Sequence, residues 1–249
     1  MTLMRRPVRS ELMKLTTTRM PWAFLVVLLV MGGINAASVA FGTDFDGSKA
    51  FVSTADDQQS LIAFAGNATM IAGLFGAIAA AREYAHLTVI PTFLADPGRR
   101  RVVVAQLVAI AVGGGVLGAL GAAITTVAVA ASLPTTEYGF LIPAVDVIQV
   151  VAASAFCGAV GAVLGAGIGI VVRNVGGAVT GAVLVLIVAP PMLVQLISST
   201  ASWVPASLAL DLSGVGSEVA APAAVFGLLL WALVPAAVGA FTVRHRDVA

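Results

Sequence analysis

The residues of this chain that are best suited to chemistry lie together in the segment 82–101, which reads REYAHLTVIPTFLADPGRRR. The segment carries four arginines, three of them consecutive at its end, and the acid Glu83 near its start. The guanidinium groups of Arg99 and Arg100 can bind carboxylates of a partner or lipid phosphates through charge-assisted hydrogen bonds. Glu83 can pair with an arginine or accept from the first N–H groups of a helix. The segment is therefore a candidate partner-binding surface; the alternative is that it only anchors the chain at the membrane surface.

Patterns that indicate catalysis are absent from the sequence. It contains no GxxxxGK[ST] phosphate-binding loop, so we do not expect the chain to hydrolyse ATP itself. The two histidines, His86 and His245, lie in separate polar segments without metal-ligand spacing. The single cysteine, Cys157, lies in an apolar run and is interpreted as a buried, inert thiol. We expect a chain that is not an enzyme and that holds no metal or cofactor.

Two uncharged apolar runs flank the segment 82–101 and must position it. Each is long enough to cross a hydrocarbon core of ~30 Å at a rise of ~1.5 Å per residue. The whole chain is 59% hydrophobic and 10% charged, whereas a soluble domain is about a quarter charged. The composition predicts an all-α integral membrane protein whose residues 1–249 form one transmembrane domain.

The apolar segments and the basic start of the chain predict its helices. Residues 1–21 are expected to form an amphipathic helix on the membrane surface, because Val8, Leu12 and Leu15 fall on one helical face. The alternative is an ordinary positive flank without a defined helix. The six segments expected to span the membrane are 22–41, 61–81, 102–131, 147–172, 175–197 and 220–243.

The distribution of charge predicts the topology. With the N-terminus inside and six spans, twelve of the thirteen basic residues lie in inner segments, and only Lys49 lies outside. Eight of the twelve acids then lie in the outer loops. Because Lys and Arg are retained in the cytoplasm, we expect both termini there. The outer loops are expected at residues 43–60, 132–146 and 198–219.

Glycines and prolines mark two of the later spans. The fourth expected span carries glycines at intervals of four residues, a spacing that lets helices approach closely in lipid. These candidate helix-packing residues are Gly161, Gly165 and Gly169. The alternative is general glycine and alanine richness. Pro190 and Pro191 interrupt the fifth expected span.

Several stretches, taken in order, resemble the type-2 ATP-binding-cassette (ABC) transporter permeases, especially those of actinobacteria. The start of the chain, with Ser10-Glu11-Leu12, Lys14-Leu15 and Arg19, is similar to the N-terminus of that family. The later similarities are Glu83-Tyr84 followed by Thr88, Pro97, Arg99 and Arg100, the glycine-rich 161–173 ending in Arg-Asn, and Pro190, Trp203 and Pro205. The chain departs from the family pattern at Leu87-Thr88, Ile90-Pro91, Gly98 and Gln106.

The resemblance implies both a fold and a role. Residues 1–21 would be the family's elbow helix, and 82–101 would contain the coupling helix that docks on a separate ATPase. The outer loop after the fifth span would hold short re-entrant helices. The implied ATPase-coupling residues are Glu83, Tyr84, His86, Thr88, Arg99 and Arg100.

The function implied is that of the permease subunit of an ATP-driven exporter in the bacterial cell membrane. Its partners would be an ABC ATPase, which binds ATP and Mg, and a second permease copy in a homodimer or related heterodimer. Nucleic acid is not an expected partner. One alternative is a membrane scaffold or immunity component that transports nothing. An ion-coupled secondary transporter is disfavoured, because no expected span carries an acid or base in its middle.

Overall fold

The computed structural model describes residues 2–44, 47–85 and 99–245, and it describes side chains from residue 7 to residue 243 within these ranges, apart from those of residues 99 and 100. Every regular element in this part of the chain is helical. The longer elements are α1 (Thr2–Thr17), α2 (Met20–Phe41), α3 (Ala55–Ile62), α4 (Ala65–Ala85), α6 (Arg99–Ser132), α7 (Ala144–Val172), α8 (Val175–Val183), α9 (Ala189–Leu196), α10 (Pro205–Leu212) and α11 (Ala221–His245). The short ones are η1 (Ala50–Val52), η2 (Leu133–Thr135), the π-helix η3 (Leu184–Val188) and η4 (Ser198–Trp203).

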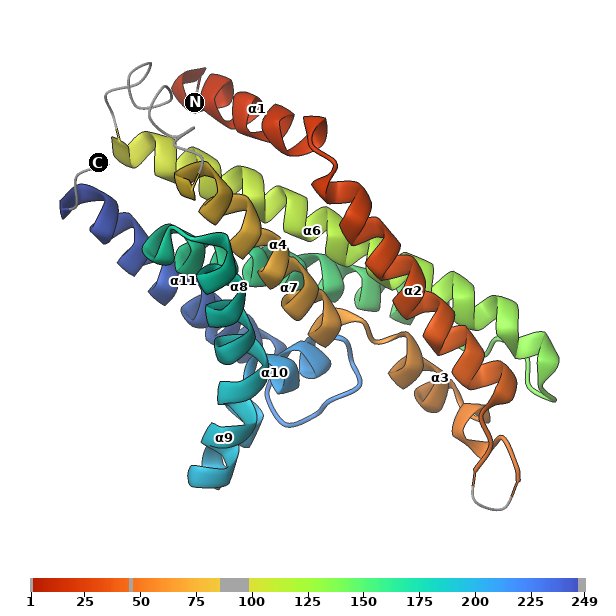
Figure 1. Ribbon diagram of the computed structural model, residues 1–249. Coiled ribbons are helices and arrows are strands. Elements are labelled where there is room, and N and C mark those ends of the chain that lie inside the picture. Colours follow the sequence, from red (N-terminus) through yellow and green to blue (C-terminus); the bar gives the residue numbers. More distant parts are fainter. Residues whose placement is uncertain (1, 45–46, 86–98, 246–249) are drawn as a thin grey trace.

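Six helical segments among the described residues are long and apolar enough to cross a membrane. They are Met20–Phe41, Ala55–Ala85, Arg101–Thr135, Ala144–Val172, Val175–Leu196 and Ala221–Val243. The all-α fold with six such helices is thereby confirmed, and the chain is a multi-pass membrane protein. The start of α1 and the end of α11 lie at the same end of the bundle (Figure 1).

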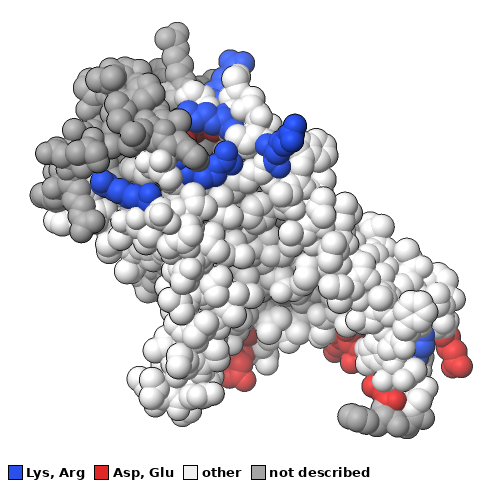
Figure 2. Space-filling view, in the orientation of Figure 1, with Lys and Arg blue, Asp and Glu red and all other residues white. Residues whose placement is uncertain are grey.

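The charged side chains separate along the bundle. Lys and Arg gather at the end that holds α1, whereas most of the visible Asp and Glu lie at the opposite end, near α3 and α10 (Figures 1 and 2). The two ends are referred to below as the basic end and the acidic end. A band of uncharged surface separates them, as expected for a protein whose middle faces hydrocarbon.

Helix α7 forms the centre of the bundle and packs against α4, α6 and α11. Of its most apolar stretch, 61% of the residues are buried within the chain, against 17% for α2. Glycines allow the close contact of α7 with α4: a Cβ placed on Gly161, Gly165 or Gly169 would overlap backbone atoms of the residues 69–81 of α4. This glycine stripe therefore lies in a contact between two helices of the same chain.

The fifth expected span does not stop at Pro190 and Pro191. Helix α8 continues through the π-helix η3 into α9, and the N–H group of Ala189 donates to the carbonyl of Leu184. Prolines have no N–H group, so carbonyls in the turn before them lose their usual donors. The wider π turn ends at Val188, two residues before Pro190, and shifts the hydrogen-bond register there. The interruption thus takes the form of a local widening instead of a helix end.

The acidic end of the bundle is more ordered than its polar sequence indicates. The expected loop 43–60 contains η1 and most of α3, and α3 is capped by reciprocal hydrogen bonds of Thr54 and Asp57. Gln58 of α3 is fully buried. Its amide donates to Val52 and Gly139 and accepts from the N–H group of Leu141 at 2.9 Å. One buried side chain therefore joins two connections at the acidic end.

Candidate functional site

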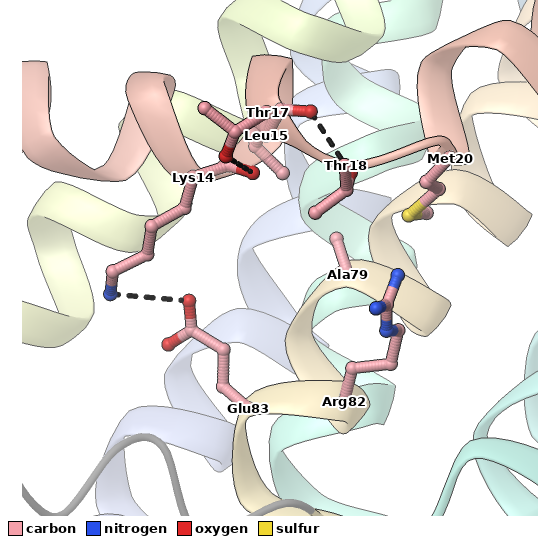
Figure 3. Close-up of a pocket in the computed structure, with 8 residues that line it drawn as sticks. All are labelled: Lys14, Leu15, Thr17, Thr18, Met20, Ala79, Arg82 and Glu83. Carbon is pink, nitrogen blue, oxygen red and sulfur yellow. Dashed lines mark hydrogen bonds and ion pairs between the residues drawn. The ribbon is translucent and has the colours of Figure 1, made fainter.

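The last turn of α4 is joined to two other helices through the carboxylate of Glu83. Lys14 Nζ of α1 lies 3.4 Å from Glu83 Oε1 (Figure 3). The amide of Gln106, on α6, donates to Glu83 Oε2 at 3.1 Å. Lys14 also pairs with Glu11, one helical turn earlier on α1, at 2.6 Å. Polar contacts therefore connect α1, α4 and α6 at the basic end, beside the segment that links α4 to α6.

This cluster is largely buried, which makes its pairing important. The exposed fraction is 4% for Glu11 and 3% for Gln106. Burial of an unpaired charge is strongly unfavourable, so each of these groups needs the others. Burial alone would lower the pKa of Lys14, but the hydrogen bond that its ammonium donates to Glu11 and the charges of Glu83 and Glu11 outweigh this effect, so the pKa is raised. Lys14 is therefore a cation throughout the neutral range.

A cavity of about 450 Å³ lies beside the cluster, between α1, the start of α2 and the last turns of α4. It is lined by Lys14, Leu15, Thr17, Thr18, Met20, Ala79, Arg82 and Glu83 (Figure 3). Arg82 forms no hydrogen bond or ion pair with any other residue of the described ranges. The lining has a cation on two walls and no nucleophile paired with a general base. The two cations, Lys14 and Arg82, suit the cavity to holding a polar or anionic group.

A second contact joins the end of α4 to the turn between α7 and α8. The guanidinium carbon of Arg173 lies 5.5 Å from the centroid of the Tyr84 ring, in cation–π geometry. Arg173 is also the C-cap of α7, and its φ of 56° is in the left-handed region that favours glycine. A non-glycine residue there costs about 1 kcal/mol or more. The side chain of Arg173 therefore offsets a backbone penalty that glycine would avoid.

Three donors of this second contact have no hydrogen-bond partner within the described structure. They are the Tyr84 hydroxyl and the Nε and Nη2 atoms of Arg173, all of them buried. Unpaired buried polar groups are rare and mark places where strain or a further ligand is involved. The end of α4 therefore carries one well-satisfied polar cluster around Glu83 and one poorly satisfied contact around Tyr84.

The structure places the sequence-predicted coupling residues unevenly. Glu83 and Tyr84 lie in the last turn of α4, in the contacts just described. Arg99 and Arg100 begin α6, and their side chains are outside the described part. His86 and Thr88 lie outside the described residues altogether.

The cluster also contains residues that sequence reasoning did not select. Glu11 and Lys14 are spaced as a helical i, i+3 pair, which was a usable signal. Gln106 was noticeable only as a departure from the family pattern. Arg173 was noted only as the end of the glycine-rich segment 161–173, and nothing in the sequence indicates its contact with Tyr84. No group of three or more His, Cys, Asp or Glu residues that could hold a metal occurs in the described ranges.

Comparisons with known proteins do not add to this picture. No protein-family model matches the chain, and no curated protein matches its sequence. The residues and their geometry are therefore the basis for its function.

Proposed function

We propose that the chain is the membrane-spanning permease subunit of an ATP-driven exporter and that it takes its work from a separate ABC ATPase. The observation that carries this proposal is the position of Glu83. It lies at the end of a membrane helix, within the arginine-rich segment 82–101, and it contacts Lys14 of α1 and Gln106 of α6. A force applied to that segment acts directly on three helices.

The packing of the bundle supports transmission of such a force. Helix α4 is in backbone contact with α7 along the glycine stripe, and side chains cannot yield between two touching backbones. Because α7 packs on α4, α6 and α11, a displacement of α4 reaches the centre of the bundle. The Tyr84–Arg173 contact adds a link from α4 to the α7–α8 turn. Movement at the basic end is therefore coupled to the apolar middle.

The proposal includes the surroundings of the chain. The basic end faces the cytoplasm of a bacterial cell, where Lys and Arg are retained and ATP is available. The ATPase holds ATP and Mg, since the chain lacks a phosphate-binding loop. A second permease copy, identical or related, completes the translocation path. Large apolar side chains that are exposed on the single chain, such as Phe41 and Leu196, face lipid or that copy.

The test is purification of the chain together with a candidate ABC ATPase from the same organism, followed by ATPase assays in lipid vesicles. Wild-type chain should bind the ATPase and stimulate it. Glu83→Ala should reduce stimulation by about ten-fold, if roughly 1.5 kcal/mol of charge-assisted hydrogen bonding is lost from the coupled state. The control is Glu137→Ala, an exposed acid in the connection between α6 and α7 at the acidic end, which should keep full stimulation.

Two outcomes would contradict the proposal. A well-inserted Glu83→Ala, Tyr84→Ala double variant with wild-type stimulation would exclude this end of α4 as the coupling site. A wild-type chain that binds no ATPase would instead favour the non-transporting scaffold. Expression and insertion of each variant are measured separately, because a residue that only anchors the segment would lower both in proportion to activity.

A further inference from the structure

A second cavity of about 350 Å³ opens between α1, α2 and α6 and shares only Leu15 with the cavity beside Glu83. Its walls are apolar and come from three helices: Leu12 of α1, Leu25 of α2 and Val116 of α6 are examples. The Phe75 ring lies within 3.0 Å of the position that a Cβ on Gly113 would take, so both residues form its floor. This cavity is called the α1–α2–α6 groove below.

The groove opens on the lateral surface of the helix bundle. The exposed fraction of its lining residues is 69% for Trp22, 48% for Val112 and 53% for Val116. In a bilayer these surfaces face hydrocarbon instead of water. An empty apolar groove would lose dispersion contacts along its walls, and water gains no hydrogen bonds there. The occupant is therefore itself apolar along the length of the groove.

The rim of the groove at the basic end is cationic and aromatic. Arg19 is the residue that precedes α2, two residues before the groove-lining Pro21. Arg9 lies about one turn before Leu12 on α1. Both arginines are exposed, and neither forms an ion pair with a residue in the described part of the chain. Tryptophan and arginine at this position are typical of the depth at which lipid headgroups lie.

We propose that the α1–α2–α6 groove binds an anionic phospholipid from the leaflet at the basic end. One acyl chain fills the groove between α2 and α6, and the phosphate lies at Arg19. A second copy of the chain is a less suitable occupant, because a two-fold interface here would bring the arginines of both copies together. This inference rests on the membrane fold and does not depend on the proposed ATPase partner.

The experiment uses Trp22 as a reporter of the lipid in the groove. The full-length chain with Trp203→Phe and Trp231→Phe retains only Trp22 of its three tryptophans. It is placed in vesicles that contain increasing fractions of brominated phosphatidylglycerol or brominated phosphatidylcholine, whose bromines quench tryptophan fluorescence on contact. The anionic lipid should reach half-maximal quenching at about a five-fold lower fraction, as expected from ~1 kcal/mol per basic residue near the surface.

Two variants separate the headgroup from the acyl chain. Arg19→Gln should remove the preference for phosphatidylglycerol while leaving quenching by phosphatidylcholine unchanged. Gly113→Leu should fill the groove and reduce quenching by both lipids. The matched control is Gly33→Leu on α2, where an added Cβ meets nothing within 4 Å. Thermal unfolding of each variant verifies that it is folded. If the Gly113→Leu variant does not fold, the Arg19→Gln variant alone still tests the proposal.

Equal quenching by both lipids in the wild-type groove, or a preference that survives Arg19→Gln, would overturn the proposal and leave only the general lipid surroundings. Absence of quenching by either lipid would also overturn it, since the groove would then be covered by protein.

Discussion

At the residue scale, Lys14 lies between two carboxylates and holds the polar cluster together. Its ammonium contacts Glu11 at 2.6 Å and Glu83 at 3.4 Å, and its side chain is 41% exposed. Without Lys14, two acids would share a poorly solvated site with no cation between them. The arrangement explains how a buried acid such as Glu11 is tolerated on α1, whose other described residues are all at least partly exposed.

We predict that Lys14→Met lowers the free energy of unfolding by roughly 1–2 kcal/mol, a value reduced from that of a fully buried pair because solvent screens the half-exposed ammonium. The pKa of Lys14 is raised above its ordinary 10.5, so its stabilisation is complete below that value and is lost as the pH rises through the raised pKa. Because Lys14 stays charged, the difference in thermal unfolding between wild type and Lys14→Met in detergent should not decrease from pH 7 to 9. A difference that disappears within this range would contradict the assignment.

A second prediction at this scale concerns Arg173. Arg173→Gly loses the cation–π contact but also relieves the left-handed backbone, whereas Arg173→Ala loses the contact and keeps the strain. The glycine variant should therefore be more stable than the alanine variant by about 1 kcal/mol. Thermal unfolding of the two variants under identical conditions measures this difference. An alanine variant that equals or exceeds the glycine variant would show that the backbone at residue 173 is not strained.

At the element scale, the seam between α4 and α7 depends on the absence of side chains. We predict that Gly165→Leu lowers the unfolding temperature by several degrees, as expected for overpacking of about 1–3 kcal/mol or more. Gly33→Leu, at a position with open space, should have little effect. Gly32 is less suitable as a control, because its Cβ would lie 2.7 Å from Ile124 Cγ2. Equal losses for the variants at Gly165 and Gly33 would indicate that glycine content matters and the seam does not.

The helices themselves follow closely from the sequence, and their contacts do not. A long uncharged run has few alternatives to a helix in a membrane, because every backbone group must be satisfied within the segment. The continuation of α8 through η3 past Pro190 was not predictable, since it requires the π turn to absorb the missing N–H groups. The hydrogen bonds of Gln58 were equally unpredictable, because its partners Gly139 and Leu141 are distant in sequence.

The same reasoning applies to the candidate site. Glu83 and Tyr84 were selected from a sequence pattern, and both lie in specific contacts at the end of α4. Lys14, Gln106 and Arg173 were not selected as site residues, because a side chain's partner on another helix depends on how the helices are rotated about their axes. Sequence periodicity gives the apolar face of a helix but not its rotation to within one side chain.

At the scale of the whole molecule, the separation of charge predicts the orientation in the membrane. We expect the acidic end outside the cell, because Lys and Arg are retained inside. In a Cys157→Ala background, single cysteines at Asp56, Glu137 and Ser217 should react with a membrane-impermeant thiol reagent on intact cells. These positions are exposed. A cysteine at Ser10 on α1, also exposed, should react only after the cells are opened. Labelling of Ser10→Cys on intact cells, with silent Glu137→Cys, would reverse the topology.

The glycine stripe of α7 also limits which mutations of the gene are tolerated. A glycine codon consists of two guanines followed by any base, so a change of the third base is silent. Every single-base change at the first two positions that encodes another amino acid gives a residue with a Cβ. At Gly161, Gly165 and Gly169 that Cβ overlaps the backbone of α4. Every amino acid that a single-base change can introduce at these positions therefore disturbs the contact between α4 and α7. A random missense change in one of these three codons is expected to reduce the amount of folded protein in the membrane.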